Sequence, residues 1–197
     1  MATHHFQPTV YYTAIGSHPP VLHIASGDTV ITTTVDSGGR DASDQQVTPG
    51  GNPQTGPFYI EGAEPGDTLA VRLDRLVPNR KLGRTATVIA PHVLDPYYVA
   101  SHLPKGEGGE WEVDVEKWSA TLKSPATKLG NFTIPLEPMV GCFGVAPPRG
   151  QAISTATSST HGGNMDYRGF AEGATVYFPV FVPGALFHIG DGHAVQG

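Results

Sequence analysis

The sequence contains a single cysteine, Cys142, so the chain cannot form an intrachain disulfide. A protein without disulfides is typical of a reducing compartment. No apolar stretch approaches the ~20 residues that a membrane-spanning helix needs. The N-terminus, MATHHFQPTVYYTA, also lacks the basic start and the apolar centre of a secretory signal. These absences predict a soluble, cytoplasmic protein with no membrane partner.

Charged residues are also scarce. They make up 15% of the chain, and 12 basic against 18 acidic residues give a net charge of −6. No run of lysine or arginine occurs, which argues against nucleic acid as a partner. The small acidic excess is typical of a surface that keeps a protein soluble.

Glycine and proline, by contrast, are abundant, with 25 and 18 residues. They are spread along the whole chain, so few windows can hold a helix of three turns. This composition predicts many short strands joined by tight turns. We therefore expect a mostly-β fold, a β-sandwich or distorted barrel with little helix, formed as a single domain over residues 1–197.

Hydrophobic periodicity places several of these strands. A β-branched run predicts a strand over residues 29–35, and the alternation of Leu69, Val71 and Leu73 predicts a strand with one buried face. The segments 175–182 and 185–190 are continuously apolar, as expected of strands buried on both faces. The least regular segment, residues 90–109, is expected to be loop with a helical turn.

Three segments combine glycine with residues that can bind metals or transfer protons. They are TVDSGG near the end of the first predicted strand, the loop STHGGNMD, and the C-terminal segment GDGHAVQG. The candidate residues in them are Asp36, His161, Asn164, Asp166, Asp191 and His193. Each segment alone is also explained as a polar turn whose Asn and Asp side chains bond the local backbone.

Together, however, these segments supply two histidines and several carboxylates. That set is sufficient for a metal ion that keeps one coordination position open for water. The sequence does not show whether the residues converge in space. Cys142 lies in the apolar run MVGCFGV and is expected to be a buried hydrophobic residue, and His188 is expected to be a packed histidine.

Four ordered stretches resemble the acetamidase/formamidase family: NPQTGPFYIEGAEPGDTLAVRL, GVAPPRG, STHGGNMD and LFHIGDGHAVQG. The resemblance extends from about Val21 to Gly197. It implies a β-rich, sandwich-like fold and hydrolysis of short linear amides to a carboxylate and ammonia. It also implies a divalent metal, with zinc favoured over calcium, and a homo-oligomer. Family members continue past the last motif, so we expect this chain to lack the C-terminal part of the family's domain.

The resemblance also assigns roles to individual residues. Asp36, His161 and His193 match positions that we expect to bind the metal, while Asp166 and Asp191 support them. Asn164 is expected to orient the substrate. Asp191 or Asp166 would act as the general base that takes a proton from water and returns it to the departing nitrogen. Gln196 matches the last motif as well.

Two other interpretations remain open. The chain could be a β-sandwich module that binds a ligand or partner without turnover. Alternatively, a serine or threonine of residues 154–160 could act as a nucleophile without a metal, although neither Gly-x-Ser-x-Gly nor Ser-x-x-Lys accompanies that run.

Overall fold

The computed structural model describes residues 1–86, 94–102 and 108–196. The chain divides into two compact units, one formed by residues 1–79 and 137–196 and the other by residues 80–136. The expectation of a single domain stays a prediction, because compactness alone does not show whether either unit folds independently. None of the helices in the described ranges has the length and apolar character needed to cross a membrane.

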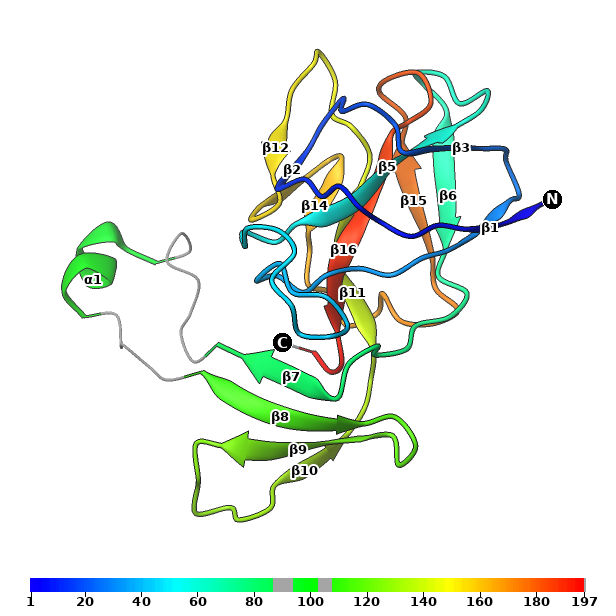
Figure 1. Ribbon diagram of the computed structural model, residues 1–197. Helices are drawn as coiled ribbons and strands as arrows, with labels where there is room; N and C mark the ends of the chain where they lie inside the picture. Colours follow the sequence, from blue (N-terminus) through cyan, green and yellow to red (C-terminus); the bar gives the residue numbers. More distant parts are fainter. Residues whose placement is uncertain (87–93, 103–107, 197) are drawn as a thin grey trace. The chain divides into compact units, whose positions relative to one another are not determined.

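The first unit is built around a six-stranded sheet with the order β13-β14-β11-β16-β5-β3 (Figure 1). Its central strands, β11, β16 and β5, pair antiparallel, and β3 joins β5 in parallel. The strands of this sheet are β3 (Leu22–Ile24), β5 (Gln54–Ile60), β11 (Met139–Gly144), β13 (Ser158–Ser159), β14 (Gly162–Asn164) and β16 (Phe187–His193).

Smaller sheets complete this unit. The pair β6 (Thr68–Arg72) and β15 (Thr175–Pro179) is antiparallel, as is the pair β2 (Ala14–Ile15) and β12 (Ile153–Ser154), whereas β1 (Thr3–His5) and β4 (Thr29–Ile31) are parallel. The main core joins Phe58, Phe143 and Phe187 of the large sheet to Phe178 of β15. Burial of this aromatic cluster holds the two layers together.

The second unit is a four-stranded antiparallel sheet with the order β10-β9-β8-β7. Its strands are β7 (Leu82–Thr85), β8 (Gly109–Asp114), β9 (Ser119–Ser124) and β10 (Thr133–Pro135). Val113, Ala120 and Leu136 are its buried apolar residues. The helix α1 (Pro96–Ser101) begins at Asp95, whose carboxylate accepts hydrogen bonds from the backbone N–H groups of Tyr97 and Tyr98.

The mostly-β prediction is confirmed, and so is a helical turn within residues 90–109, of which 90–93 and 103–107 lie outside the described residues. The burial expected of 185–190 is found at each of these residues except Ile189, which is half-buried, and the strand β16 begins only at Phe187. Two details were wrong. The strand expected over 29–35 ends at Ile31, although Val35 is buried, and β15 alternates between buried and exposed residues because only one of its faces meets the core.

Candidate metal centre

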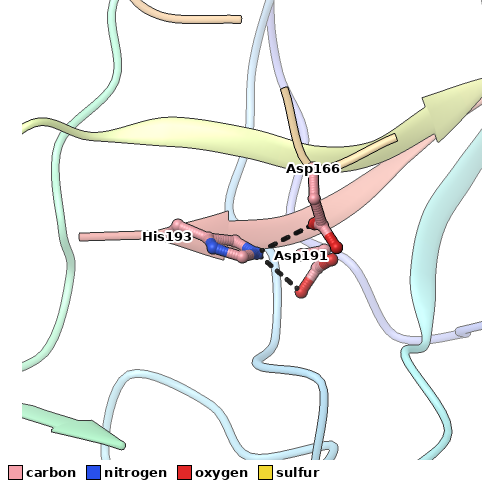
Figure 2. Close-up of side chains that lie close together, drawn as sticks. All are labelled: Asp166, Asp191 and His193. Atoms are coloured by element: carbon pink, nitrogen blue, oxygen red, sulfur yellow. Dashed lines mark ion pairs between the residues drawn. The ribbon is translucent and has the colours of Figure 1, made fainter. Parts of the chain in front are cut away.

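Asp166, Asp191 and His193 converge at one end of the large sheet (Figure 2). Asp191 and His193 are alternate residues of β16 and so share a face of the strand. Asp166 follows β14. One ligand atom from each residue can be chosen so that all three lie within 4.8 Å of one another. Within the described part of the chain, no other group of three or more His, Cys, Asp or Glu residues meets this criterion.

The backbone aims both carboxylates at the histidine. Asp166 and Asp191 have φ angles of 43° and 56°, a left-handed conformation that aspartate tolerates better than most residues. The backbone N–H groups of Met165 and Asp166 both donate to the carbonyl of Gly141, at 2.9 and 3.1 Å. As a result, Nε2 of His193 lies 3.5 Å from Oδ1 of Asp166 and 3.3 Å from Oδ1 of Asp191.

Gly141 makes room for this cluster. A Cβ at position 141 would lie 2.5 Å from Oδ1 of Asp166, 2.6 Å from Oδ2 of Asp191 and 2.7 Å from Nε2 of His193. Three potential ligand atoms therefore point to a place that only a glycine leaves free.

Two amide side chains hold the carboxylates in place. Nδ2 of Asn52 lies 3.1 Å from Oδ2 of Asp191 and 3.1 Å from Oδ1 of Asn164. Nδ2 of Asn164 in turn lies 3.4 Å from Oδ2 of Asp166. Asn52 also donates to the backbone carbonyl of Thr155, which can only accept a hydrogen bond, and this contact fixes the orientation of its amide.

A further amide, Gln196, donates to the backbone carbonyl of Asp166 at 3.0 Å. Gln196 was predicted from the last motif, and the structure places it next to the cluster. The final residue of that motif, Gly197, lies outside the described residues.

The electrostatics of the cluster match a cation site. A hydrogen bond with Asp191 raises the pKa of His193, and burial opposes this change. Burial, followed by the charge of Asp191, raises the pKa of Asp166. Two carboxylates crowd one imidazole here, so a divalent cation would relieve the repulsion between them.

The donor set of two carboxylates and one imidazole fits zinc. Zinc in catalytic sites is commonly held by three side chains of these types, with the fourth position left to water or substrate. Calcium prefers oxygen ligands alone, which the imidazole of His193 does not supply.

The structure does not bring Asp36 and His161 into this group. Asp36 lies in the loop after β4, where Oδ1 accepts a hydrogen bond from the backbone N–H of Arg40 at 2.8 Å. His161 is 1% exposed, and neither of its ring nitrogens has a hydrogen-bond partner. As ligands, both stay predictions, whereas His193, Asp166 and Asp191 meet as a cluster.

Sequence reasoning missed Asn52 and Gly141. The available signal for Asn52 was its position after Gly50-Gly51, since asparagine is favoured among non-glycine residues in left-handed turns, and its φ is 62°. Gly141 gave no such signal, because it lies inside an apolar strand.

Two hydroxyl groups of residues 154–160 make hydrogen bonds that serve the local structure. The hydroxyl of Thr155 donates to the carbonyls of Thr13 and Gly51 at 3.0 and 2.9 Å. The hydroxyl of Thr157 donates to the carbonyl of Ser154 at 3.1 Å. Neither hydroxyl is paired with an imidazole or amine that could remove its proton.

Comparison with known proteins agrees with the family resemblance seen in the sequence. Residues 149–197 match the model of the Acetamidase/Formamidase family. The chain is 24% identical over 192 residues to a Schizosaccharomyces pombe protein named Putative formamidase C869.04, a match that covers 73% of this chain and 45% of that protein.

Solved structures extend the likeness to the fold. The acetamidase from Bacillus halodurans is 30% identical to this chain, with a TM-score of 0.73. The match covers 98% of this chain and 63% of the acetamidase. The acetamidase from Yersinia enterocolitica is 28% identical with a TM-score of 0.75, covering 99% of this chain and 61% of its own. The chain thus spans less than two thirds of the length of these relatives.

Proposed function

We propose that this chain, which is similar to the acetamidase/formamidase family, carries the metal centre of a hydrolase that converts short linear amides to a carboxylate and ammonia. The observation that supports this most directly is the convergence of Asp166 Oδ1, Asp191 Oδ2 and His193 Nε2 over Gly141. These residues would hold the ion, with zinc as the proposed metal.

Amides are difficult to hydrolyse because the carbonyl carbon is weakly electrophilic and the nitrogen is a poor leaving group. A bound divalent cation supplies polarisation of the carbonyl and lowers the pKa of a water molecule from about 15.7 towards ~7. The protein must then hold the substrate and manage the protons.

Asp166 is suited to the proton transfer. It is the exposed carboxylate of the cluster, and burial together with Asp191 raises its pKa, which favours uptake of a proton. Its Oδ1 faces the cluster while its Oδ2 lies beside the amide of Asn164. In this proposal Asp166 accepts a proton from the attacking water and returns it to the departing nitrogen.

Asp191 and Asn164 have supporting roles. Asp191 is buried and is held by Asn52, so it provides a fixed negative charge that favours a cation. The amide of Asn164 can bond the substrate's carbonyl or nitrogen when it releases one of its present partners. These are the roles in which the three residues were predicted from the sequence, with Asp166 now preferred over Asp191 as the base.

The test is ammonia release from formamide and acetamide, with elemental analysis of the same protein. We expect one equivalent of zinc, turnover that disappears on chelation and returns when zinc is added, and loss of both metal and turnover in Asp191→Asn. Asp74→Asn, at an exposed carboxylate paired with Arg72, is the matched control. Full turnover by metal-free protein would refute the metal role. Stoichiometric metal without hydrolysis of any short amide would instead support the binding-module interpretation.

The homo-oligomer and the cytoplasmic location implied by the resemblance and the composition stay proposals. Light scattering of the purified chain tests the first, and fractionation of cells with an antibody against the chain tests the second.

A further inference from the structure

Buried polar atoms without partners are concentrated in one part of the large sheet. Among the described residues, the buried side-chain atoms that lack a hydrogen-bond partner are Oε1 of Gln54, both ring nitrogens of His161, and Nε2 of His188. The exposed fractions of these residues are 0%, 1% and 0%. Buried polar atoms in folded proteins are nearly always satisfied, so these atoms indicate a site for a hydrogen-bonding molecule.

Tyr12 places Gln54 and His188 in the same region. Gln54 of β5 pairs with Gly190 of β16, and a Cβ at Gly190 would lie 2.9 Å from Oε1 of Gln54, so the amide lies across that glycine. The register of β16 with β5 shifts between Phe187 and Ile189, on either side of His188. Tyr12 forms a bridge with Gln54, and its ring meets that of His188 edge-on with the centroids 6.2 Å apart.

His161 belongs to the same region. Gly144 of β11 pairs with His188 on one side and with Gly162 on the other, and His161 is the residue before Gly162. The two imidazoles are close enough to influence each other, since a positive charge on His161 would be one of the causes that lower the pKa of His188. This polar interior, formed by Gln54, His161 and His188, is called the histidine chamber below.

The hydrogen bonds that are present fix the chemistry of the chamber. Nδ1 of His188 lies 3.1 Å from the carbonyl of Leu186, which can only accept, so Nδ1 carries the proton and Nε2 presents a lone pair. Nε2 of Gln54 donates to the carbonyl of Asn52 at 3.0 Å, which leaves Oε1 as an acceptor. His161 is kept neutral by burial, which lowers its pKa, so its ring offers one N–H and one lone pair.

Two fixed acceptors and one donor match a primary carboxamide. Its –NH₂ group has two N–H donors, and its carbonyl oxygen accepts from one N–H. A carboxylate does not fit. It has no N–H or O–H to donate to the two acceptors, His188 Nε2 and Gln54 Oε1, and it would bring a negative charge into a buried site.

The chamber is also connected to the candidate metal centre. Nε2 of Gln54 lies 3.3 Å from Oδ1 of Asn52, whose Nδ2 donates to Asp191. On the other side, Tyr12 and His18 stack with ring centroids 3.9 Å apart, and each meets His188 edge-on. Both are only partly buried, so this ring pair contacts His188 and also reaches solvent.

We propose that the histidine chamber binds a primary carboxamide, with His188 Nε2 and Gln54 Oε1 accepting its two N–H groups and His161 donating to its carbonyl. This inference rests on the proposed function for the identity of the ligand, because a short carboxamide is the class of molecule that the proposed hydrolase takes. It does not rest on metal binding.

The experiment follows ¹⁵N signals of the histidine rings in metal-depleted protein during titration with acetamide, and separately with acetate. We expect saturable shifts for His188 and His161 with acetamide only. His23, an exposed histidine paired with Glu61, serves as the internal reference and should not move. Absence of shifts at His188 and His161 up to saturating acetamide, or equal shifts with acetate, would overturn the proposal.

Variants separate this proposal from the proposed function. His188→Phe and Gln54→Met should each weaken acetamide binding about tenfold or more, because a buried donor of the ligand loses its acceptor. They should still bind one zinc. His193→Ala should lose zinc but retain the acetamide-induced shifts. Gln45→Met, at an exposed glutamine, is the matched control for Gln54.

Failure of the chamber assignment can be distinguished from failure of the proposed hydrolysis. If both chamber variants fold, as judged by their thermal unfolding, and bind acetamide as the wild type does, the chamber assignment is wrong while metal-dependent hydrolysis can stand. If acetamide binds in the chamber but metal-loaded protein releases no ammonia from any short amide, the chamber stands and the proposed hydrolysis fails.

Discussion

Asn52 and Asp191 are separated by 139 positions in the sequence, yet Nδ2 of Asn52 lies 3.1 Å from Oδ2 of Asp191. The same amide also bonds Asn164, which reaches Asp166, so a single side chain is linked to both carboxylates of the cluster. A residue that orients metal ligands from outside the coordination sphere commonly affects metal affinity as strongly as a weak ligand would.

We therefore expect Asn52→Ala to weaken zinc binding by about 10–100-fold while the fold is retained. Competition with a chromophoric chelator measures the affinity, and circular dichroism checks the fold. Asn131→Ala, at an exposed asparagine, should bind zinc as the wild type does. An unchanged affinity in Asn52→Ala would show that the Asn52 contacts are structural only.

Gly141→Ala should abolish zinc binding through steric hindrance. The added methyl group would lie 2.5–2.7 Å from three potential ligand atoms, a distance at which atoms must move apart. Gly141 does not have a positive φ, so its backbone accepts alanine without strain. The direct measurement is zinc stoichiometry by elemental analysis after gel filtration.

Gly192→Ala is the matched control for this substitution. Gly192 lies in the neighbouring strand β16, and an added Cβ would meet only Oγ1 of Thr34 at an ordinary 3.4 Å. We expect this variant to keep its zinc. Stoichiometric zinc in Gly141→Ala would mean that the three atoms do not form the ligand set.

Much of this arrangement could be predicted from the sequence. Glycine and proline indicated the short strands, and the final motif indicated Asp191 and His193, because alternate residues of a strand share a face. The position of Asp166 relative to them could not be predicted, since it depends on β14 pairing with β11, which in turn pairs with β16.

Other features of the site could not be predicted for similar reasons. His161 and Asp166 lie in one motif, but His161 lies within the hairpin that joins β13 to β14 and is buried near His188, whereas Asp166 lies beyond β14. The role of Gly141 depends on empty space beside a strand, which periodicity does not report. His188 is buried, as expected of a packed histidine, but its unpartnered Nε2 could not be predicted from its apolar run.

Protonation of the buried histidines should destabilise the protein in mild acid. Burial is the main cause that lowers the pKa of His188 from 6.5 to about 3. Between these two pH values His188 is protonated in the unfolded chain but stays neutral in the folded chain. The stability that the neutral ring confers is therefore complete above pH 6.5 and is lost as the pH falls. The loss between pH 6.5 and pH 5 should be about 1.5 kcal/mol for His188 alone.

Urea unfolding at pH 6.5, 6.0, 5.5 and 5.0 tests this expectation. His188→Phe should flatten the fall in the free energy of unfolding over this pH range. The range from pH 6.5 to pH 5.0 separates this effect from the titration of two other kinds of group. Lowered carboxylate pKa values, as at Asp28, matter only below about pH 4, and the raised pKa of His193 matters above pH 6.5. Equal slopes in His188→Phe and the wild type would contradict the buried, neutral state of His188.

The hydroxyl-rich segment 154–160 should affect stability and not chemistry. The hydroxyl of Thr155 is buried and donates to the carbonyls of Thr13 and Gly51. Thr155→Val would leave the carbonyl of Gly51 without this donor, whereas the carbonyl of Thr13 would still accept from the backbone N–H of residue 155. The expected cost is about 1–3 kcal/mol in the free energy of unfolding. Because the hydroxyl does not contact the metal cluster, turnover per folded, zinc-loaded molecule should stay within about twofold of the wild type.

Ser159→Ala is the matched control, since Ser159 is exposed in β13, and it should change neither stability nor turnover. A nucleophile would give the opposite pattern, because its removal abolishes turnover even when the free energy of unfolding is unchanged. Ammonia release normalised to zinc content, measured beside urea unfolding of the same samples, therefore distinguishes a buried structural hydroxyl from a catalytic one.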